Sequence, residues 1–184
     1  MTELASTGQL RASYLRWALV AVPGIVLLGT LSGVLSQSGE GNAWFDALTK
    51  PAIYPPSQLF GIVWTALYAL MGLALALVLS ARGAWGRERA VIAFAVQLVL
   101  NLAWSPVFFG AHQIAGALIV IMLLDVAVIV TMLLFWRVRP LAAWLLLPYL
   151  AWILFATALT WQFLIANPGA DDREVSGAAQ RIEL

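Results

Sequence analysis

Cysteine is absent from this chain, histidine occurs once, and charged residues make up only 10% of its 184 residues. Without cysteine there is no disulfide, no thiolate nucleophile and no thiolate metal ligand. His112 alone cannot assemble a metal site, so we expect neither a metal nor another cofactor. No nucleophile is paired with a general base, which argues against hydrolytic chemistry. We also expect no nucleic-acid partner, although the formal net charge of +1 by itself says little, because the distribution of charge matters more than its sum.

Hydrophobic residues take the place of the missing charges. They make up 62% of the chain, and the mean hydropathy is +0.91, whereas soluble domains are nearer half apolar. Apolar windows of roughly 20 residues match, as helices, a bilayer core of about 30 Å. Runs such as LALALVL lack the strict alternation of β-barrel strands. We therefore predict an all-α fold, a bundle of five transmembrane helices, at about residues 17–36, 59–80, 90–109, 113–136 and 141–165.

The segments outside these spans differ greatly in length. Residues 1–16 form a polar N-terminal tail, and residues 37–58 form a long loop between the first two spans. The later connections are short, which makes sequential helices antiparallel neighbours in one membrane domain over residues 17–166. Residues 167–184 are polar and charged, and we expect them to be a disordered C-terminal tail.

The basic residues predict the orientation of the bundle. With five spans, the N-terminus shares one side of the membrane with the second and fourth connections. That side carries Arg11, Arg16, Arg82, Arg87, Arg89, Arg137 and Arg139, and the other carries Lys50, Arg173 and Arg181. Basic residues favour the cytoplasmic side. We thus expect a multi-pass protein of a bacterial cell membrane, with a cytoplasmic N-terminus and the long loop outside.

The long loop has the composition of a lid. It leads into the second span through the stretch WFDALTKPAIYPP, which contains Trp44, Lys50, Pro51, Pro55 and Pro56. Each proline fixes its own φ, removes a backbone donor and biases the preceding residue towards extended structure. We interpret this restricted loop as a lid over a pocket.

Three spans each place aromatic and hydrogen-bonding side chains on one helical face. The spacings select Trp64 and Tyr68 in the second span, Gln97, Asn101, Trp104 and Phe108 in the third, and Tyr149, Trp152, Ala156 and Thr160 in the fifth. Amide groups in hydrocarbon are costly unless they face the bundle interior. Two interpretations remain open: a packed core cross-linked by amides, or a ring-lined cavity for a flat apolar ligand.

Three other features have alternative interpretations. Gly29 and Gly33 form a G-x-x-x-G step, which serves either packing within one chain or a dimer contact. Asp125 is an acid inside a span, either a neutral carboxyl bonded to a neighbour or a polar, proton-coupled group beside the pocket. For His112 we favour a solvated turn residue over an axial haem ligand.

With these motifs the chain resembles the translocator protein family, also called tryptophan-rich sensory protein, TspO/MBR or peripheral benzodiazepine receptor. The resemblance rests on WFDALTKPAIYPPSQLFGIVWTALYALMG, QLVLNLAWSPVFFGAHQ and PLAAWLLLPYLAWILFATAL, in this order. It implies a five-helix membrane bundle, often a homodimer, that binds porphyrins such as protoporphyrin IX, sterols and synthetic aromatic ligands.

The resemblance also assigns roles to residues. Trp64 and Trp152 match two pocket tryptophans. In some bacterial members of the family these tryptophans are linked to light-dependent breakdown of protoporphyrin, so the resemblance implies that Trp64 and Trp152 are possible redox residues. Further matches are pocket positions at Asn101, Trp104 and Ala156, and the KPxxxPP lid motif at Lys50, Pro51, Pro55 and Pro56.

Some positions depart from the family. Tryptophans are usual where this chain has Ile53 and Gln58, and in one branch where it has Gly116. Thr160 replaces an asparagine. The end of the fifth span lacks the tyrosine and following basic residue of a proposed cholesterol motif, which argues against sterol binding.

Three functions follow as hypotheses. The first is a membrane sensor or translocator that binds a tetrapyrrole. The second is a light-dependent porphyrin-degrading enzyme that uses Trp64 and Trp152. The third is a dimeric regulatory scaffold that signals to a partner through its loops.

Overall fold

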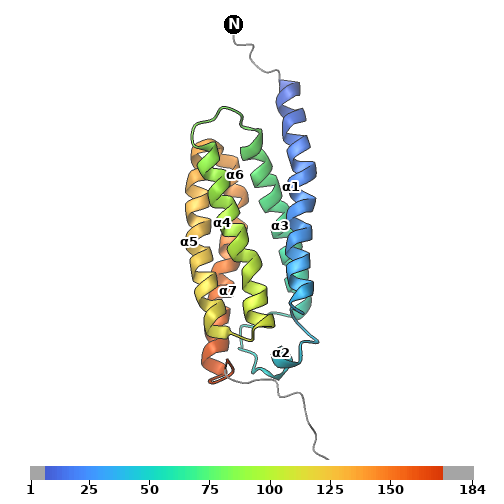
Figure 1. Cartoon of the computed structure of the whole chain (residues 1–184), viewed down its shortest axis with the longest axis vertical. Helices are drawn as coiled ribbons and strands as arrows, with labels where there is room; N and C mark the ends of the chain where they lie inside the picture. The colour runs from blue at the N-terminus through green and yellow to red at the C-terminus, as the bar shows by residue number, and fades with distance from the viewer. Residues whose placement is uncertain (1–6, 172–184) are drawn as a thin grey trace, which may run out of the picture.

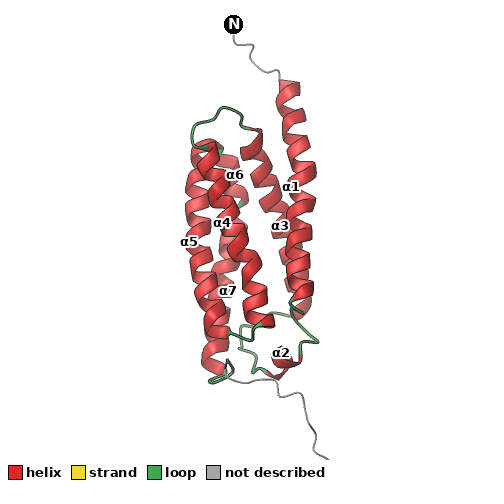
Figure 2. Ribbon diagram, in the orientation of Figure 1, coloured by secondary structure: helices red, strands yellow, loops and turns green. Residues whose placement is uncertain are grey.

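The computed structural model describes residues 7–171, and all regular structure in that part of the chain is helical (Figure 2). The long helices are α1 (Thr7–Leu35), α3 (Ser57–Ser80), α4 (Arg87–Ser105), α5 (Ile114–Val138) and α7 (Leu147–Ala166). Short helices are α2 (Ala43–Ala47), η1 (Pro106–Gly110) and α6 (Pro140–Leu145). Taken with these extensions, five helical segments are long and apolar enough to cross a membrane. The predicted all-α, five-helix fold is confirmed, and the protein is an integral multi-pass membrane protein.

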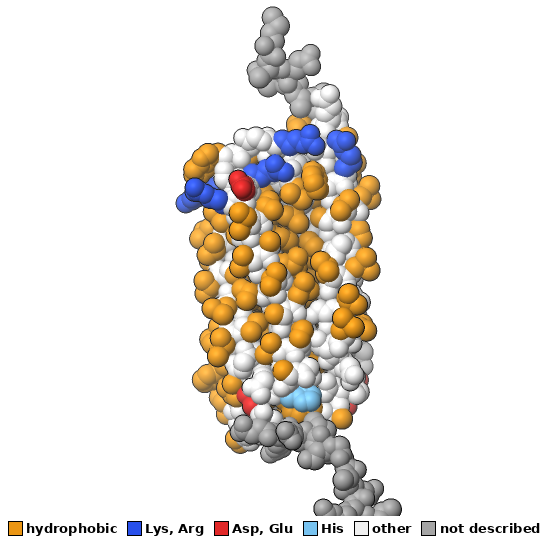
Figure 3. All heavy atoms as spheres, in the orientation of Figure 1, with side chains coloured by type: hydrophobic (Ala, Val, Ile, Leu, Met, Phe, Trp, Pro, Cys, Tyr) orange, Lys and Arg blue, Asp and Glu red, His pale blue; other side chains and the backbone are white. Residues whose placement is uncertain are grey.

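The five spans form one upright bundle, and their connections lie at its two ends (Figure 1). The first turn of α1, the α3–α4 connection and the junction of α5 with α6 lie at one end. The other end holds α2 with the long loop around it and the η1–α5 turn. We call residues 36–56 the lid. Exposed apolar side chains cover the sides of the bundle between these ends (Figure 3), as expected for a surface that faces lipid.

Helix α1 begins at Thr7, well before the predicted start of the first span at residue 17. The intervening residues are polar enough to look like a tail, yet they continue the helix. The rest of the predicted N-terminal tail, residues 1–6, lies outside the described residues.

Prolines explain the two irregular spans. Pro106 has no N–H to donate to the carbonyl of Leu102 four residues earlier, and α4 widens there into the π-helical turn η1. The freed Leu102 oxygen accepts a hydrogen bond from Ser32 Oγ of α1 at 2.7 Å. Near Pro148 the predicted fifth span is divided into α6 and α7, with Leu146 between them.

Helices α1 and α3 approach each other closely because two glycines face the partner helix. A Cβ atom on Gly72 would lie 2.6 Å from the Val22 backbone, and one on Gly29 would overlap the Tyr68 ring. Gly29 therefore supports packing within the chain, which is one of the two interpretations of the G-x-x-x-G step.

Candidate functional site

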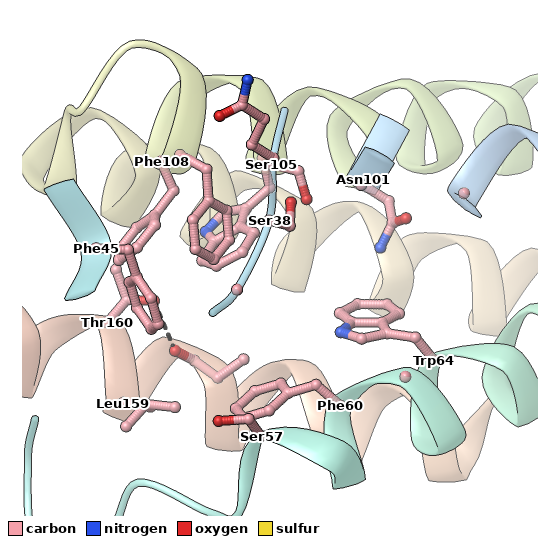
Figure 4. Close-up of a pocket in the computed structure, with 18 of the residues that line it drawn as sticks. Ser38, Phe45, Ser57, Phe60, Trp64, Asn101, Ser105, Phe108, Leu159 and Thr160 are labelled. Atoms are coloured by element: carbon pink, nitrogen blue, oxygen red, sulfur yellow. Dashed lines mark hydrogen bonds between the residues drawn. The ribbon is translucent and has the colours of Figure 1, made fainter. Parts of the chain in front are cut away.

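A cavity of about 840 Å³ lies in the lid half of the bundle, between α1, α3, α4 with η1, α5 and α7 (Figure 4). It draws together most of the residues that the helical spacings selected: Trp64, Tyr68, Asn101, Trp104, Phe108, Trp152, Ala156 and Thr160. The three faces predicted from the sequence therefore converge on one space.

Gln97 and Tyr149 lie behind the cavity rather than in its lining. Both are fully buried, and they belong to a chain of side-chain hydrogen bonds that spans three helices. Tyr68 Oη donates to Asn101 Oδ1 at 3.1 Å, and Asn101 Nδ2 donates to Tyr149 Oη at 3.1 Å. Tyr149 Oη in turn donates to Gln97 Oε1 at 3.0 Å. We call these four residues the amide–tyrosine chain.

The amide–tyrosine chain stabilises polar side chains inside the bundle. A polar side chain in a low-dielectric interior is stable only if its donors and acceptors are paired. Here both ends of the Asn101 amide are occupied by tyrosine hydroxyls from α3 and α7, so its orientation at the cavity wall is fixed. The Tyr68 ring is held in addition by stacking on Trp64, with ring centroids 5.3 Å apart.

Aromatic rings make up much of the remaining wall. Trp104 and Phe108, one helical turn apart, stack with centroids separated by 5.0 Å at an angle of 18°. Trp152 meets the ring of Phe60 edge to face at 5.8 Å. Further rings that the sequence analysis did not select also line the cavity, namely Phe45, Tyr54, Phe60, Phe109 and Phe163.

Two of these missed residues belong to the lid. Phe45 and Tyr54 reach the cavity, whereas Trp44, Lys50 and the three lid prolines are not among its lining residues. Phe45 lies in α2, which Asn42 caps by accepting the Phe45 N–H at 3.1 Å. Trp44 and the prolines predicted that this segment is a lid, but they did not indicate which of its rings points into the cavity.

The predicted lid residues hold the lid in shape. Trp44 stacks on His112 at 4.8 Å with an angle of 19° between the rings. His112 occupies the tight η1–α5 turn with φ +57°, and it belongs to no cluster of potential metal ligands in the described residues. Pro51 accepts the Tyr54 N–H at 2.9 Å, and Pro56 precedes the first turn of α3.

Lys50 is tied to the inner side of the lid. Its ammonium donates to the carbonyl oxygens of Phe45 and Leu48 and lies 4.0 Å from the centroid of the Phe45 ring. Burial lowers the pKa of Lys50, and the nearby carboxylate of Asp46 opposes that shift in part. Lys50 thus acts as an internal fastener of α2 rather than as a free surface charge.

The segment after α7 is ordered against the lid. Asn167 Oδ1 accepts the Thr49 N–H at 2.7 Å, and Asn167 Nδ2 donates to the Thr49 carbonyl at 3.0 Å. The Ala170 carbonyl accepts the Trp44 indole N–H at 3.4 Å. The Asp171 carboxylate accepts the N–H groups of Ile114 and Ala115 at 2.7 and 3.0 Å, at the start of α5.

We call residues 167–171 the latch. They begin the segment that the sequence predicts to be disordered, and in the structure Asn167 and Asp171 each have backbone partners far away in the chain. The remainder of the predicted C-terminal tail, residues 172–184, lies outside the described residues.

Of the four positions that depart from the family pattern, two line the cavity and two do not. Gln58 and Thr160 line the cavity, and the Thr160 hydroxyl is already bonded to the Ala156 carbonyl at 2.8 Å. Ile53 is 40% exposed and is not part of the lining. Gly116 also lies outside the lining, packed near Gln113 and Val107.

Comparisons with known proteins agree with these observations. The model of the TspO/MBR family matches residues 19–165, which include the lid and all or most of each of the five spans. The chain is 42% identical to the human translocator protein over 137 residues, 73% of this chain and 80% of the relative. It is 43% identical over 148 residues to the tryptophan-rich protein TspO of Chlorobaculum tepidum, 79% of this chain and 92% of the relative. Protein CrtK of Rhodobacter capsulatus is 40% identical over 131 residues, with coverage of 70% and 81%.

Proposed function

This chain belongs to the TspO/MBR family, and from that premise we propose that it is a membrane sensor or translocator that binds a flat tetrapyrrole, such as protoporphyrin IX, under its lid. The observation that carries the proposal is the cavity of about 840 Å³ with aromatic walls. Its size lies within the roughly 300–1,000 Å³ of typical ligand sites. Rings from α3, η1, α7 and the lid offer faces and edges on which a planar ligand can stack.

Polar side chains occur in the lining as well, among them Gln58, Ser105 and Asn101. Tyr68 and Tyr149 hold the Asn101 amide in position, so this residue gives the wall a fixed polar point beside the aromatic rings. A site of this kind favours a ligand that is largely apolar and carries a small number of hydrogen-bonding atoms. Porphyrins have this character.

The surroundings of the cavity favour a lipophilic ligand as well. Thr30 of α1 and Thr65 of α3 line the cavity and are exposed at the same time. At these two residues the lining is therefore not closed off from the outside of the bundle, where the bilayer would lie. A ligand that dissolves in the membrane could enter here without crossing the aqueous side of the lid.

A dark titration of protoporphyrin IX into the purified protein tests the proposal. We expect saturable binding with one ligand per chain, accompanied by quenching of tryptophan fluorescence. The control variant is Leu28→Ala, a truncation at an exposed α1 position that is not part of the cavity lining, and it should bind as the wild type does. Linear, non-saturating quenching in the wild type would reduce the interaction to partitioning into detergent and would contradict the proposal.

A second candidate function is light-dependent degradation of the bound porphyrin. It is favoured by the presence of both Trp64 and Trp152 in the lining of one cavity, where an indole could give an electron to a photo-excited ligand. Under illumination Trp64→Phe and Trp152→Phe should still bind protoporphyrin, since a phenyl ring keeps much of the stacking, but lose the coloured product. Equal bleaching in wild type and both variants would mean photochemistry of the free pigment and would remove the enzymatic assignment.

Homodimer formation and a scaffold role remain predictions from the family resemblance. Sedimentation of the purified protein with and without protoporphyrin tests the first. A variant that no longer binds porphyrin but keeps its cellular phenotype would favour the second. The departure from the proposed cholesterol motif leads us to expect no sterol binding.

A further inference from the structure

Asp125 of α5 is a carboxyl group within the membrane-spanning part of the bundle, and its side chain is 9% exposed. Of the eight basic residues in the described chain, Lys50 lies in the lid, and the other seven lie near the start of α1, the α3–α4 connection or the α5–α6 junction, at the opposite end of the bundle (Figure 1). The carboxyl has one hydrogen-bonding partner, the hydroxyl of Thr157 on α7, and its Oδ1 atom is buried without a partner. An ionised carboxylate in such a place would be unusually costly.

The geometry around Thr157 indicates where the hydrogen atoms are. Thr157 Oγ1 lies 2.8 Å from Asp125 Oδ2 and 2.9 Å from the carbonyl oxygen of Ile153, one turn earlier in α7. A hydroxyl has only one hydrogen to donate. A single hydrogen can serve both acceptors only as a shared, weaker three-centre bond, whereas two full hydrogen bonds form if Asp125 supplies the second hydrogen. The arrangement is then Asp125 Oδ2–H to Thr157 Oγ1, and Thr157 O–H to the Ile153 carbonyl.

The Asp125–Thr157 contact lies directly behind the cavity wall. Leu124 and Ala156, the residues that immediately precede the pair, both line the cavity. The contact joins α5 to α7 at this depth, so it fixes how the two lining residues stand relative to each other. If Asp125 lost its proton, the single hydrogen of the Thr157 hydroxyl would be left for two acceptors, the Asp125 carboxylate and the Ile153 carbonyl, so one of the two hydrogen bonds would be lost or weakened.

A second titratable group acts on this site. Tyr149 of α7 interacts electrostatically with Asp125, and its hydroxyl is the centre of the amide–tyrosine chain that holds Asn101. Gln97 of α4, the last member of that chain, has a buried Nε2 with no partner. A negative charge on Asp125 would therefore be felt by the groups that orient the polar point of the cavity.

We propose that Asp125 is a proton-binding site of the bundle and that the proton it holds keeps the α5–α7 wall in its ligand-binding arrangement. The protonated carboxyl links α5 to α7 through its hydrogen bond to Thr157, and ionisation removes this link. The affinity of the cavity for its ligand thus falls when Asp125 ionises. This last statement rests on the proposed function, whereas the proton site itself does not.

Infrared spectroscopy of the carboxyl group tests the proton site without any ligand. In a detergent that has no ester carbonyl, wild-type protein at neutral pH should show the C=O stretch of a protonated carboxylic acid. The band should be absent from Asp125→Asn, and it should shift but persist in Thr157→Val, which removes the hydroxyl and keeps the side-chain shape. Asp171→Asn is the matched control, since that carboxylate lies outside the membrane on backbone N–H groups, and it should leave the band unchanged. A wild-type spectrum without the band would overturn the proposal.

A pH series with protoporphyrin IX tests the coupling. Dissociation constants of wild type and Asp125→Asn are compared at each pH, so that titration of the porphyrin itself cancels in their ratio. The ratio should change by about tenfold, the usual scale for coupled sites, over the pH interval in which the infrared band disappears. A constant ratio across that interval would refute the coupling. If the band is present but wild type binds no protoporphyrin at any pH, the proton site stands and the proposed ligand is wrong.

Discussion

Asn101 illustrates how one amide can define the polarity of a membrane cavity. Both of its hydrogen-bonding atoms are already used by tyrosines, so the residue is fixed before any ligand arrives. Such preorganisation lowers the entropic cost of binding. The surrounding rings are constrained as well, because Trp64 stacks on Tyr68 and Trp104 stacks on Phe108.

At the residue scale, Trp152 should contribute directly to affinity. An aromatic pair is worth about 0.5–1.5 kcal/mol beyond the burial of its area, so Trp152→Ala should weaken protoporphyrin binding several-fold. Trp152→Phe should lose less, because a ring still meets Phe60. Fluorescence titration measures both constants, and thermal unfolding checks that the variants are folded. An unchanged affinity in a folded Trp152→Ala protein would remove this residue from the site.

A second prediction at this scale concerns the α1–α3 contact. Gly72→Ala would place a Cβ atom 2.6 Å from the Val22 backbone, and overpacking of this kind typically costs about 1–3 kcal/mol. We expect a lower midpoint of thermal unfolding. The matched control is Gly24→Ala in α1, where a Cβ would meet no atom within 4 Å and where alanine favours the helix by about 1 kcal/mol. Equal stability of the two variants would contradict the close approach.

At the scale of elements, the lid depends on segments that are distant in the sequence. Asn42 donates its Nδ2 hydrogen to the Phe109 carbonyl in η1 at 3.2 Å, and the latch binds the lid from the other side through Thr49 and Trp44. The buried side chains of Trp44, Phe45 and Leu48 also hold the lid, and we expect the hydrogen bonds to influence how often it opens.

Loss of the latch should therefore loosen the lid. Asn167→Ala leaves the Thr49 N–H and carbonyl without their partner, at a cost of roughly 0.5–1.5 kcal/mol per hydrogen bond. We expect faster hydrogen exchange at residues 48–50 and faster dissociation of protoporphyrin. Asn167→Asp keeps the acceptor for the Thr49 N–H but places a carboxylate oxygen against the carbonyls of Thr49 and Phe163, so its effect should be at least as large as that of alanine. Exchange rates that match the wild type in both variants would show that the lid does not need the latch.

At the scale of the whole molecule, the two ends of the bundle differ in charge. Seven arginines surround the end away from the lid, and Glu88 is the one acid there among the described residues. The lid end has Lys50 with Glu40, Asp46 and Asp171. Exposed tryptophans at positions 85, 136 and 144 lie near the arginine-rich end, where indole rings favour a membrane interface.

This asymmetry predicts the orientation in the cell. A cysteine introduced at Arg82 should react only after the membrane is permeabilised, whereas one at Glu40 should react with an impermeant maleimide in intact cells. Both positions are exposed, and the natural chain has no cysteine, so labelling has no background. Labelling of both positions from the outside would contradict the orientation, and labelling of Glu40→Cys only after permeabilisation would reverse it.

The sequence by itself determined the class of the protein and the faces that meet inside it. Long apolar runs leave no soluble alternative, and the 3.6-residue period places Trp64 with Tyr68 and Asn101 with Trp104 on single faces. Those signals are local, because they depend on composition and on the geometry of one helix. The family motifs are local in the same sense, and the family they indicated is confirmed.

The tertiary structure decided everything that depends on contacts between distant segments. Which lid ring faces inward, Phe45 rather than Trp44, follows from how α2 docks on η1. Gln97 and Tyr149 share a face with lining residues, yet they fall behind the wall because neighbouring helices cover them. Residues 167–171 look unstructured in the sequence because the partners of Asn167 and Asp171 are backbone groups more than fifty residues away. Polar residues of this kind carry no local signal, since hydrogen bonds to remote backbone exist only after the bundle has formed.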